Sequence, residues 1–226
     1  MDTTKYREAT RIHTSVLAAV EKRCLIWMAR RLPQAVNSDH LTALAGLAMA
    51  GAGVCYWIGP GSLTAMLAAI AMLAVNWFGD SLDGTLARVR RQERPRYGFY
   101  VDHVLDVVGI LCLLAGFALG GFMNPLIAAG FLVAYYLLMV EIALATHAVG
   151  IFRISFWKFG PTELRLLLVV GTLQLLRSPF VTIAGERVLL FDVGGVVAIV
   201  VLLLTFTVSA LRNGRLLYRL EPRTGG

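Results

Sequence analysis

The segment from Asp80 to Asp106 reads DSLDGTLARVRRQERPRYGFYVDHVLD and joins two long apolar stretches. It carries carboxylates at Asp80, Asp83, Asp102 and Asp106, where a membrane-spanning segment normally has apolar side chains. Each charged residue at the centre of a bilayer costs about 2.5 to 3.5 kcal/mol, so four uncompensated ones would oppose insertion by roughly 10 kcal/mol. The segment therefore predicts a site at which cations or water stabilise the carboxylates.

Helical spacing groups these side chains into two stripes, because residues three and four apart lie on one face of a helix. The stripes combine carboxylates with small residues: Asp80, Asp83 and Ala87 on the first helix, and Gly98, Asp102 and Asp106 on the second. Packed against each other, the two faces would form a pocket of oxygen ligands suited to Mg²⁺ or Mn²⁺. Two such ions about 3.5 to 4 Å apart are the usual arrangement for displacement at phosphorus.

Composition places this segment in a membrane protein. The chain is 58% hydrophobic and 15% charged, and its mean hydropathy is +0.71, which excludes a disordered chain or an ordinary soluble domain. The net charge of +7 comes without an aromatic-interleaved basic patch, so nucleic acid is not an expected partner. We expect an all-α, polytopic membrane protein with six transmembrane helices and an N-terminal amphipathic helix.

Six apolar segments are each long enough to cross about 30 Å of hydrocarbon. They cover residues 41–58, 62–87, 98–121, 124–148, 162–182 and 187–211. Of the 21 Lys and Arg residues, 19 fall in the termini, in alternate loops or, as Arg165 does, in the first turn after such a loop. The other two are Arg177 and Arg187. The positive-inside rule then places both termini and the turn between Asp80 and Asp106 in the cytoplasm.

The N-terminal region alternates apolar and basic residues from about Thr14 to Leu32. This pattern is typical of a helix that lies on the inner membrane surface, and the alternative is an amphipathic helix that faces only solvent. We therefore expect residues 1–36 to form a cytoplasmic segment with this helix, 37–215 to form the six-helix catalytic domain, and 216–226 to form a cytoplasmic tail.

The central segment contains a recognisable string: Asp80-x2-Asp83-Gly84-x2-Ala87-Arg88, nine residues, then Gly98-x3-Asp102-x3-Asp106. It resembles the signature of the CDP-alcohol phosphotransferase family (CDP-alcohol phosphatidyltransferases), which are integral membrane enzymes. The gap is one residue longer than in the commonest form of the signature, and we expect it to lie in a turn. The resemblance implies a metal-dependent enzyme of phospholipid synthesis, a homodimer, in a prokaryotic plasma (inner) membrane.

The resemblance also implies roles for these residues. The metal ligands would be Asp80, Asp83 and Asp102, with Asp106 as the general base that also touches a metal. The cytidine diphosphate would contact Asp80, Asp83, Gly84, Ala87, Arg88 and Gly98. Asp106 would take a proton from an acceptor hydroxyl, whose oxygen attacks the phosphorus distal to cytidine so that CMP leaves. Two Mg²⁺ or Mn²⁺ ions would neutralise charge on the pyrophosphate.

The resemblance does not decide the substrates. We expect CDP-diacylglycerol as donor and a small polar alcohol, of the glycerol phosphate or inositol phosphate type, as acceptor. The alternative within the family is a CDP-choline or CDP-ethanolamine donor acting on diacylglycerol. Outside the family, membrane carboxylates at these spacings would also suit a cation transporter or a catalytically silent membrane scaffold.

Four residues near the fifth apolar segment are candidates for binding the acceptor: Arg153, Lys158, Glu163 and Arg165. Their basic side chains would hold a phosphate on the acceptor, or would reach lipid head groups instead. Three further polar residues stand out in apolar surroundings. Asn76 is a candidate for supporting the site by hydrogen bonding, with an ordinary packing role as the alternative. We expect His103 to serve in helix packing or at an interface rather than as a metal ligand, and Glu141 to have its partner on another helix.

Overall fold

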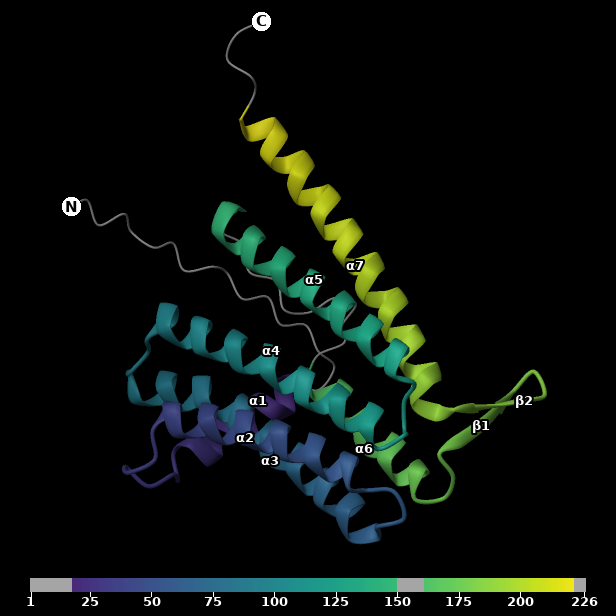
Figure 1. Cartoon of the computed structure of the whole chain (residues 1–226). Coiled ribbons are helices and arrows are strands. Elements are labelled where there is room, and N and C mark those ends of the chain that lie inside the picture. Colours follow the sequence, from purple (N-terminus) through teal and green to yellow (C-terminus); the bar gives the residue numbers. More distant parts are fainter. Residues whose placement is uncertain (1–17, 150–160, 222–226) are drawn as a thin grey trace, which may run out of the picture.

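The computed structural model describes residues 18–149 and 161–221, which form seven helices and one short hairpin (Figure 1). The elements are α1 (Ala18–Ala29), α2 (Ser38–Trp57), α3 (Leu63–Arg90), α4 (Pro95–Leu119), α5 (Pro125–Val149), α6 (Pro161–Leu175), β1 (Phe180–Ile183), β2 (Glu186–Leu189) and α7 (Leu190–Leu220). Five of them, α2, α3, α4, α5 and α7, are long and apolar enough to cross a membrane. The prediction of an all-α, polytopic membrane protein is confirmed.

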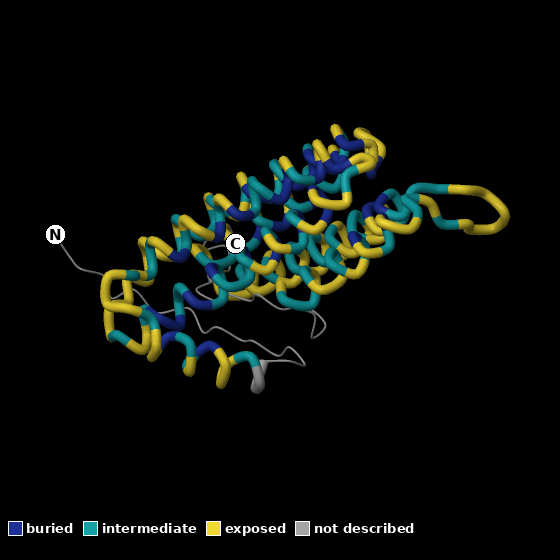
Figure 2. Tube along the Cα trace, turned by 90° about the horizontal axis from the view of Figure 1, so that it is seen from below, coloured by how far each residue is buried: buried dark blue, intermediate teal, exposed yellow. Residues whose placement is uncertain are grey.

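Helix α6 is the exception among the predicted spans. It has 15 residues, whereas a membrane-spanning helix needs about 20, so the count of six spans stays a prediction. The predicted segment 162–182 is wrong at its C-terminal end, because residues 180–189 form the antiparallel β1–β2 hairpin. Ala184 and Gly185 in its turn have φ values of 53° and 90°, a combination typical of a type I′ turn. The exposed tip of the hairpin projects from the helices (Figure 2).

The packing of α2 decides where the two motif helices lie. Helix α2 packs on both α3 and α4, whereas α3 and α4 make few contacts with each other (Figure 1). A Cβ on Gly53 of α2 would lie 2.2 Å from the carbonyl oxygen of Cys112 in α4, and one on Gly79 of α3 would lie 2.6 Å from that of Leu41 in α2. The two motif faces therefore meet across a cavity through their side chains, and the packing of α2 on both helices holds them there.

The apolar core joins this group of helices to α6. Tyr56 of α2 is fully buried, and its ring meets Phe117 of α4 edge-on with 4.5 Å between ring centroids. Its hydroxyl lies 2.5 Å from Oγ1 of Thr172 in α6. Since a buried hydroxyl needs a hydrogen-bond partner, this contact fixes α6 beside the core.

Helix α1 packs against the C-terminal half of α3. Leu25 and Ala29 are buried in a cluster with Leu82 and Leu86. Trp27 faces away and is 55% exposed. The apolar face of this helix therefore meets the protein at Leu25, and its place on the membrane surface stays a prediction.

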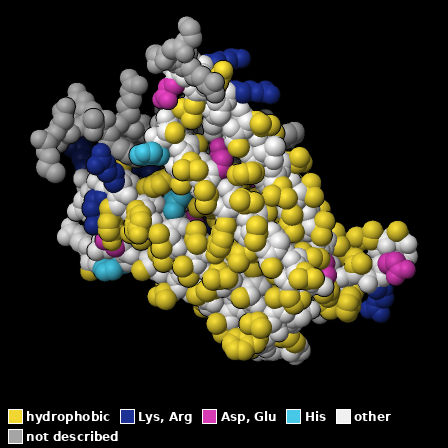
Figure 3. Space-filling view, turned by 45° about the horizontal axis from the view of Figure 1, so that its top comes forward, with side chains coloured by type: hydrophobic (Ala, Val, Ile, Leu, Met, Phe, Trp, Pro, Cys, Tyr) yellow, Lys and Arg dark blue, Asp and Glu magenta, His cyan; other side chains and the backbone are white. Residues whose placement is uncertain are grey.

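Helices α5 and α7 pack along each other, and α5 also packs on α4 (Figure 1). Glu141 of α5 is buried and accepts hydrogen bonds from Ser209 at 2.8 Å and Asn213 at 2.7 Å, both in α7. The prediction that its partners lie on another helix is confirmed. Hydrophobic side chains cover most of the face seen in Figure 3, with Lys and Arg at its edges, as expected of a lipid-facing surface.

Candidate active site

The four motif aspartates line one cavity. Asp80 and Asp83 come from α3, and Asp102 and Asp106 come from α4. Helix α2 closes the space between them with Thr42, Ala45, Gly46 and Met49. The three helices thus bring together residues that are far apart in the sequence, and the cavity combines four carboxylates with a small, partly apolar wall.

Three of the carboxylates converge on one point. One oxygen from each of Asp80, Asp102 and Asp106 lies within 4.8 Å of the others. Asp80 and Asp102 are half-buried and Asp106 is exposed. Mg²⁺ and Mn²⁺ prefer oxygen ligands, and carboxylates this close repel one another unless a cation lies between them. The donor set therefore fits a divalent metal.

Asp83 lines the same cavity but is held differently. Its Oδ2 accepts a hydrogen bond of 2.6 Å from Thr42 Oγ1 in α2, and its Oδ1 lies 2.5 Å from the amide nitrogen of Gly84. Both contacts fix the orientation of the carboxylate. Asp83 is therefore placed beside the three converging aspartates, while its predicted role as a metal ligand stays a prediction.

Arg165 reaches this cluster from α6. Its Nη2 donates to Asp80 Oδ2 at 2.6 Å and its Nε donates to Asn76 Oδ1 at 2.7 Å. Asn76 in turn donates to the carbonyl of Ala45 in α2 at 2.9 Å. Sequence reasoning anticipated that Asn76 supports the site, and the structure supplies its partners. The hydrogen bond to Asp80 places Arg165 beside the aspartates, while its predicted role in binding the acceptor stays a prediction.

The third nitrogen of Arg165 has no acceptor in the part of the chain that the structure describes. Nη1 is buried and has no hydrogen-bond partner among residues 18–149 and 161–221. A buried guanidinium nitrogen without an acceptor is costly, so a bound anion would stabilise it. Glu163, also on α6, is half-buried. The other two predicted acceptor residues, Arg153 and Lys158, lie outside the described residues.

The predicted nucleotide contacts lie around the turn that joins α3 to α4. Helix α3 ends at Arg90 and α4 begins at Pro95, so the prediction that the long gap contains a turn is confirmed. A Cβ on Gly98 would meet no atom within 4 Å. Arg88 is exposed, and its Nη2 donates to Thr85 Oγ1 at 3.1 Å. Gly84 and Ala87 are half-buried, and the contact of these residues with a nucleotide stays a prediction.

An ion pair fixes the same turn to α2. Arg94 donates a hydrogen bond to Asp39, near the start of α2. That hydrogen bond raises the pKa of the Arg94 guanidinium. Arg94 therefore ties the turn between α3 and α4 to the N-terminal end of α2.

His103 contacts a residue of its own helix α4, and its predicted role in helix packing stays a prediction. Its Nδ1 lies 2.9 Å from the carbonyl oxygen of Phe99, and the two rings are 3.9 Å apart between centroids. His103 is not among the converging metal-ligand groups.

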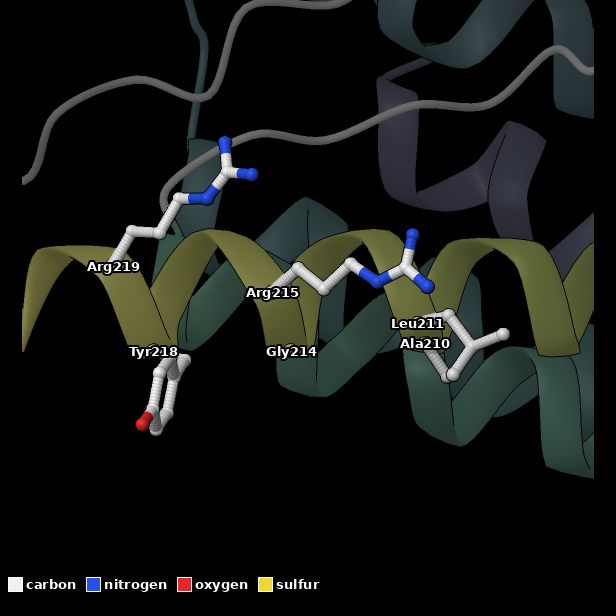
Figure 4. Close-up of a pocket in the computed structure, with 6 residues that line it drawn as sticks. All are labelled: Ala210, Leu211, Gly214, Arg215, Tyr218 and Arg219. Atoms are coloured by element: carbon white, nitrogen blue, oxygen red, sulfur yellow. The ribbon is translucent and has the colours of Figure 1, made fainter.

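A second pocket lies elsewhere, along the C-terminal part of α7 (Figure 4). It is lined by Ala210, Leu211, Gly214, Arg215, Tyr218 and Arg219. None of the aspartates or predicted substrate-binding residues belongs to it. The cavity between α2, α3 and α4 therefore remains the candidate active site.

Sequence reasoning missed Thr42 as a residue of the site. Leu41 and Ala43 on either side of it are apolar, and helical periodicity shows which face it occupies but not which residue of another helix it meets. Only the packing of α2 on α3, fixed by Gly79, reveals its contact with Asp83.

Comparison with known proteins agrees with this site. The model of the CDP-alcohol phosphatidyltransferase family matches residues 36–211 of the chain, a range that includes every residue of the cavity. No curated protein matches the chain.

Proposed function

Because the chain belongs to the CDP-alcohol phosphatidyltransferase family, we propose that it transfers a phosphatidyl group from CDP-diacylglycerol to a small polar alcohol that carries a phosphate. The acceptor is of the glycerol phosphate or inositol phosphate type, and CMP is released. The contact between Arg165 and Asp80 carries this proposal, since it places a guanidinium beside the carboxylate cluster. A phosphate held there would bring the acceptor to the reacting group.

The four aspartates would hold the metal. When bound, Mg²⁺ or Mn²⁺ neutralises charge on the pyrophosphate oxygens. At full ionisation the four carboxylates and the Arg165 guanidinium give the cavity a formal charge of −3. One divalent cation would leave that charge negative, which disfavours binding of a diphosphate. We therefore propose two ions, which make the site positive.

Asp106 is the proposed general base. It is exposed at the cavity, so an acceptor hydroxyl can reach its carboxylate. Asp106 takes the hydroxyl proton, and the oxygen attacks the phosphorus distal to cytidine. The bond from that phosphorus to the bridging oxygen breaks, and the oxygen leaves with CMP. Asp80, Asp83, Gly84, Ala87, Arg88 and Gly98 would bind the cytidine diphosphate.

Arg165 is the proposed anchor for the acceptor. Its Nη1 is buried without an acceptor among the described residues, and guanidinium groups bind phosphate strongly and directionally. We include Glu163, Arg153 and Lys158 as further acceptor-binding residues on sequence grounds. Together these groups would distinguish a phosphorylated alcohol from a neutral one.

The proposed setting is a prokaryotic plasma membrane, with the site on the cytoplasmic side and the enzyme a homodimer. Residues 37–215 would form the catalytic domain between cytoplasmic segments at 1–36 and 216–226. The turn next to the site is rich in arginine, which supports this orientation by the positive-inside rule. These residues are Arg88, Arg90, Arg91, Arg94 and Arg96. There a soluble acceptor and a lipid-linked donor can meet.

Release of CMP by the purified protein tests the proposal. With Mg²⁺ and CDP-diacylglycerol, we expect CMP only when glycerol 3-phosphate or an inositol phosphate is added, and none with inositol or serine. EDTA should abolish the release. Asp106→Asn should lower the rate at least about 100-fold, because it removes the base.

Asp192→Asn is the matched control. Asp192 lies outside the cavity and accepts a 2.6 Å hydrogen bond from the amide of Asn124, which the asparagine oxygen can still accept. Activity with CDP-choline or CDP-ethanolamine and diacylglycerol alone would reverse the donor assignment. If no pair of donor and acceptor gives CMP, the proposed enzymatic function is refuted, and a cation transporter or a catalytically silent scaffold remains as the alternative.

A further inference from the structure

The carboxylate of Glu21 in α1 accepts hydrogen bonds from two other helices, α3 and α6. Its Oε1 accepts a hydrogen bond of 2.7 Å from Thr162 Oγ1 in α6 and one of 3.0 Å from Trp77 Nε1 in α3. Ser81 Oγ, also in α3, lies 3.5 Å from the same oxygen. One carboxylate therefore ties α3 to α6.

These contacts surround the centre of the site. Trp77 and Ser81 lie on either side of Asp80 in α3. Thr162 lies about one turn before Arg165 in α6. Glu21 thus ties together α3 and α6, the same two helices that the hydrogen bond from Arg165 to Asp80 links.

We propose that Glu21 is a positioning residue: its carboxylate fixes α6 against α3 and thereby holds Arg165 at Asp80. Leu25 and Ala29 support it, because they bury the same side of α1 one and two turns further on. Helix α1 is then part of the support of the active site, in addition to any contact with the membrane. The kinetic consequence rests on the proposed function, whereas the effect on helix spacing does not.

A carboxylate suits this position. An ionised oxygen accepts several hydrogen bonds, and hydrogen bonds to charged groups are stronger than neutral ones. Glutamine keeps one carbonyl oxygen at the same distance along the side chain, whereas alanine keeps none. Glu21→Gln should therefore retain most of the function that Glu21→Ala loses.

The first test is kinetic. We expect Glu21→Ala to raise the KM for the phosphorylated acceptor about tenfold or more, with a smaller change in the KM for CDP-diacylglycerol. Thr162→Val, which removes one donor, should act in the same direction. Glu186→Ala is the matched control, because Glu186 is exposed on the hairpin.

A double-mutant cycle separates positioning from general support of the fold. If Glu21 acts through Arg165, Glu21→Ala should raise the acceptor KM much less in an Arg165→Lys background than in the wild type. Equal and independent effects in both backgrounds would overturn the proposal, since they would mean that Glu21 acts elsewhere.

The second test measures helix spacing without activity. Spin labels on Cys24 of α1 and on Leu167→Cys of α6, both exposed positions, report the α1–α6 distance by pulsed EPR once Cys55 and Cys112 are replaced by alanine. Glu21→Ala should shift or broaden this distribution, and Glu186→Ala should not.

The outcomes separate this proposal from the proposed function. A wild type that releases no CMP refutes the function, while the EPR comparison still decides whether Glu21 fixes α6. An unchanged distance distribution in Glu21→Ala overturns the proposal that Glu21 fixes the position of α6. A broadened distribution with wild-type acceptor KM would also overturn the proposal, because the site would not depend on the contact.

Discussion

A single methyl group at Gly53 should disturb an active site that Gly53 does not touch. In Gly53→Ala the new Cβ would lie 2.2 Å from the carbonyl oxygen of Cys112 and 3.2 Å from the amide nitrogen of Leu113. Ordinary contact begins at 3.4 Å, and both neighbours are backbone atoms that no rotamer change can move. Helices α2 and α4 must therefore separate by more than 1 Å.

The separation should cost both stability and activity. Overpacking of this kind costs about 1 to 3 kcal/mol, which for a chain of this length lowers Tm by roughly 3 to 10 °C. Helix α4 carries Asp102 and Asp106, so its movement takes their carboxylates away from Asp80. A misplacement of about 1 Å at reacting groups can lower the rate about 100-fold.

Thermal unfolding of the detergent-solubilised protein and CMP release measure the two effects. Gly194→Ala is the matched control, because a Cβ at Gly194 of α7 would meet no atom within 4 Å. Alanine favours a helix over glycine by about 1 kcal/mol, so this control should melt at or above the wild-type temperature with unchanged activity. If Gly53→Ala behaves like the control, α2 and α4 do not approach as closely as the structure indicates.

Two further substitutions test individual contacts. Arg165→Lys keeps the charge but replaces the planar guanidinium, whose Nε and Nη2 reach Asn76 and Asp80 separately, by a single nitrogen. The acceptor KM should therefore rise about 10- to 100-fold while the donor KM changes little; equal changes in both would contradict an acceptor role. Glu141→Leu leaves the Ser209 hydroxyl and the Asn213 amide without their acceptor between α5 and α7. It should lower the free energy of unfolding by about 1 to 2 kcal/mol, and a variant that melts at or above the wild-type temperature would show that the pair is held by apolar packing alone.

The helices and the carboxylate stripes were predictable from the sequence because both depend on local periodicity. Apolar length marks α2 to α5, and the steps of four from Gly98 to Asp106 mark one face of α4. The hairpin was not predictable in this way, since Val181, Ile183 and Val188 continue an apolar run that suits either a strand or a span. Its turn at Ala184 and Gly185 is a weak signal, because alanine rarely adopts a positive φ.

Contacts between helices were the part that periodicity could not supply. Periodicity assigns each residue to a face of its own helix, but its partners depend on the register between helices. This holds for Thr42, Glu21 and Arg165. That register follows from close backbone approaches such as the one at Gly79, where a Cβ would come within 2.6 Å of the Leu41 carbonyl oxygen. A glycine in an apolar segment does not reveal from sequence alone whether another helix lies against it.

The role of α2 shows why the motif is not the whole site. Every proposed catalytic and metal-binding residue lies on α3 or α4, yet these two helices make few contacts with each other. Helix α2 contacts α3 at Gly79 and α4 at Cys112, and its Thr42 fixes the carboxylate of Asp83. Carboxylates repel one another, so α3 and α4 alone would have no force to keep Asp80 near Asp106 without a cation. The close packing of α2 therefore holds the aspartates together in the absence of a metal or substrate. It thereby reduces the conformational entropy that the site would lose when a ligand binds.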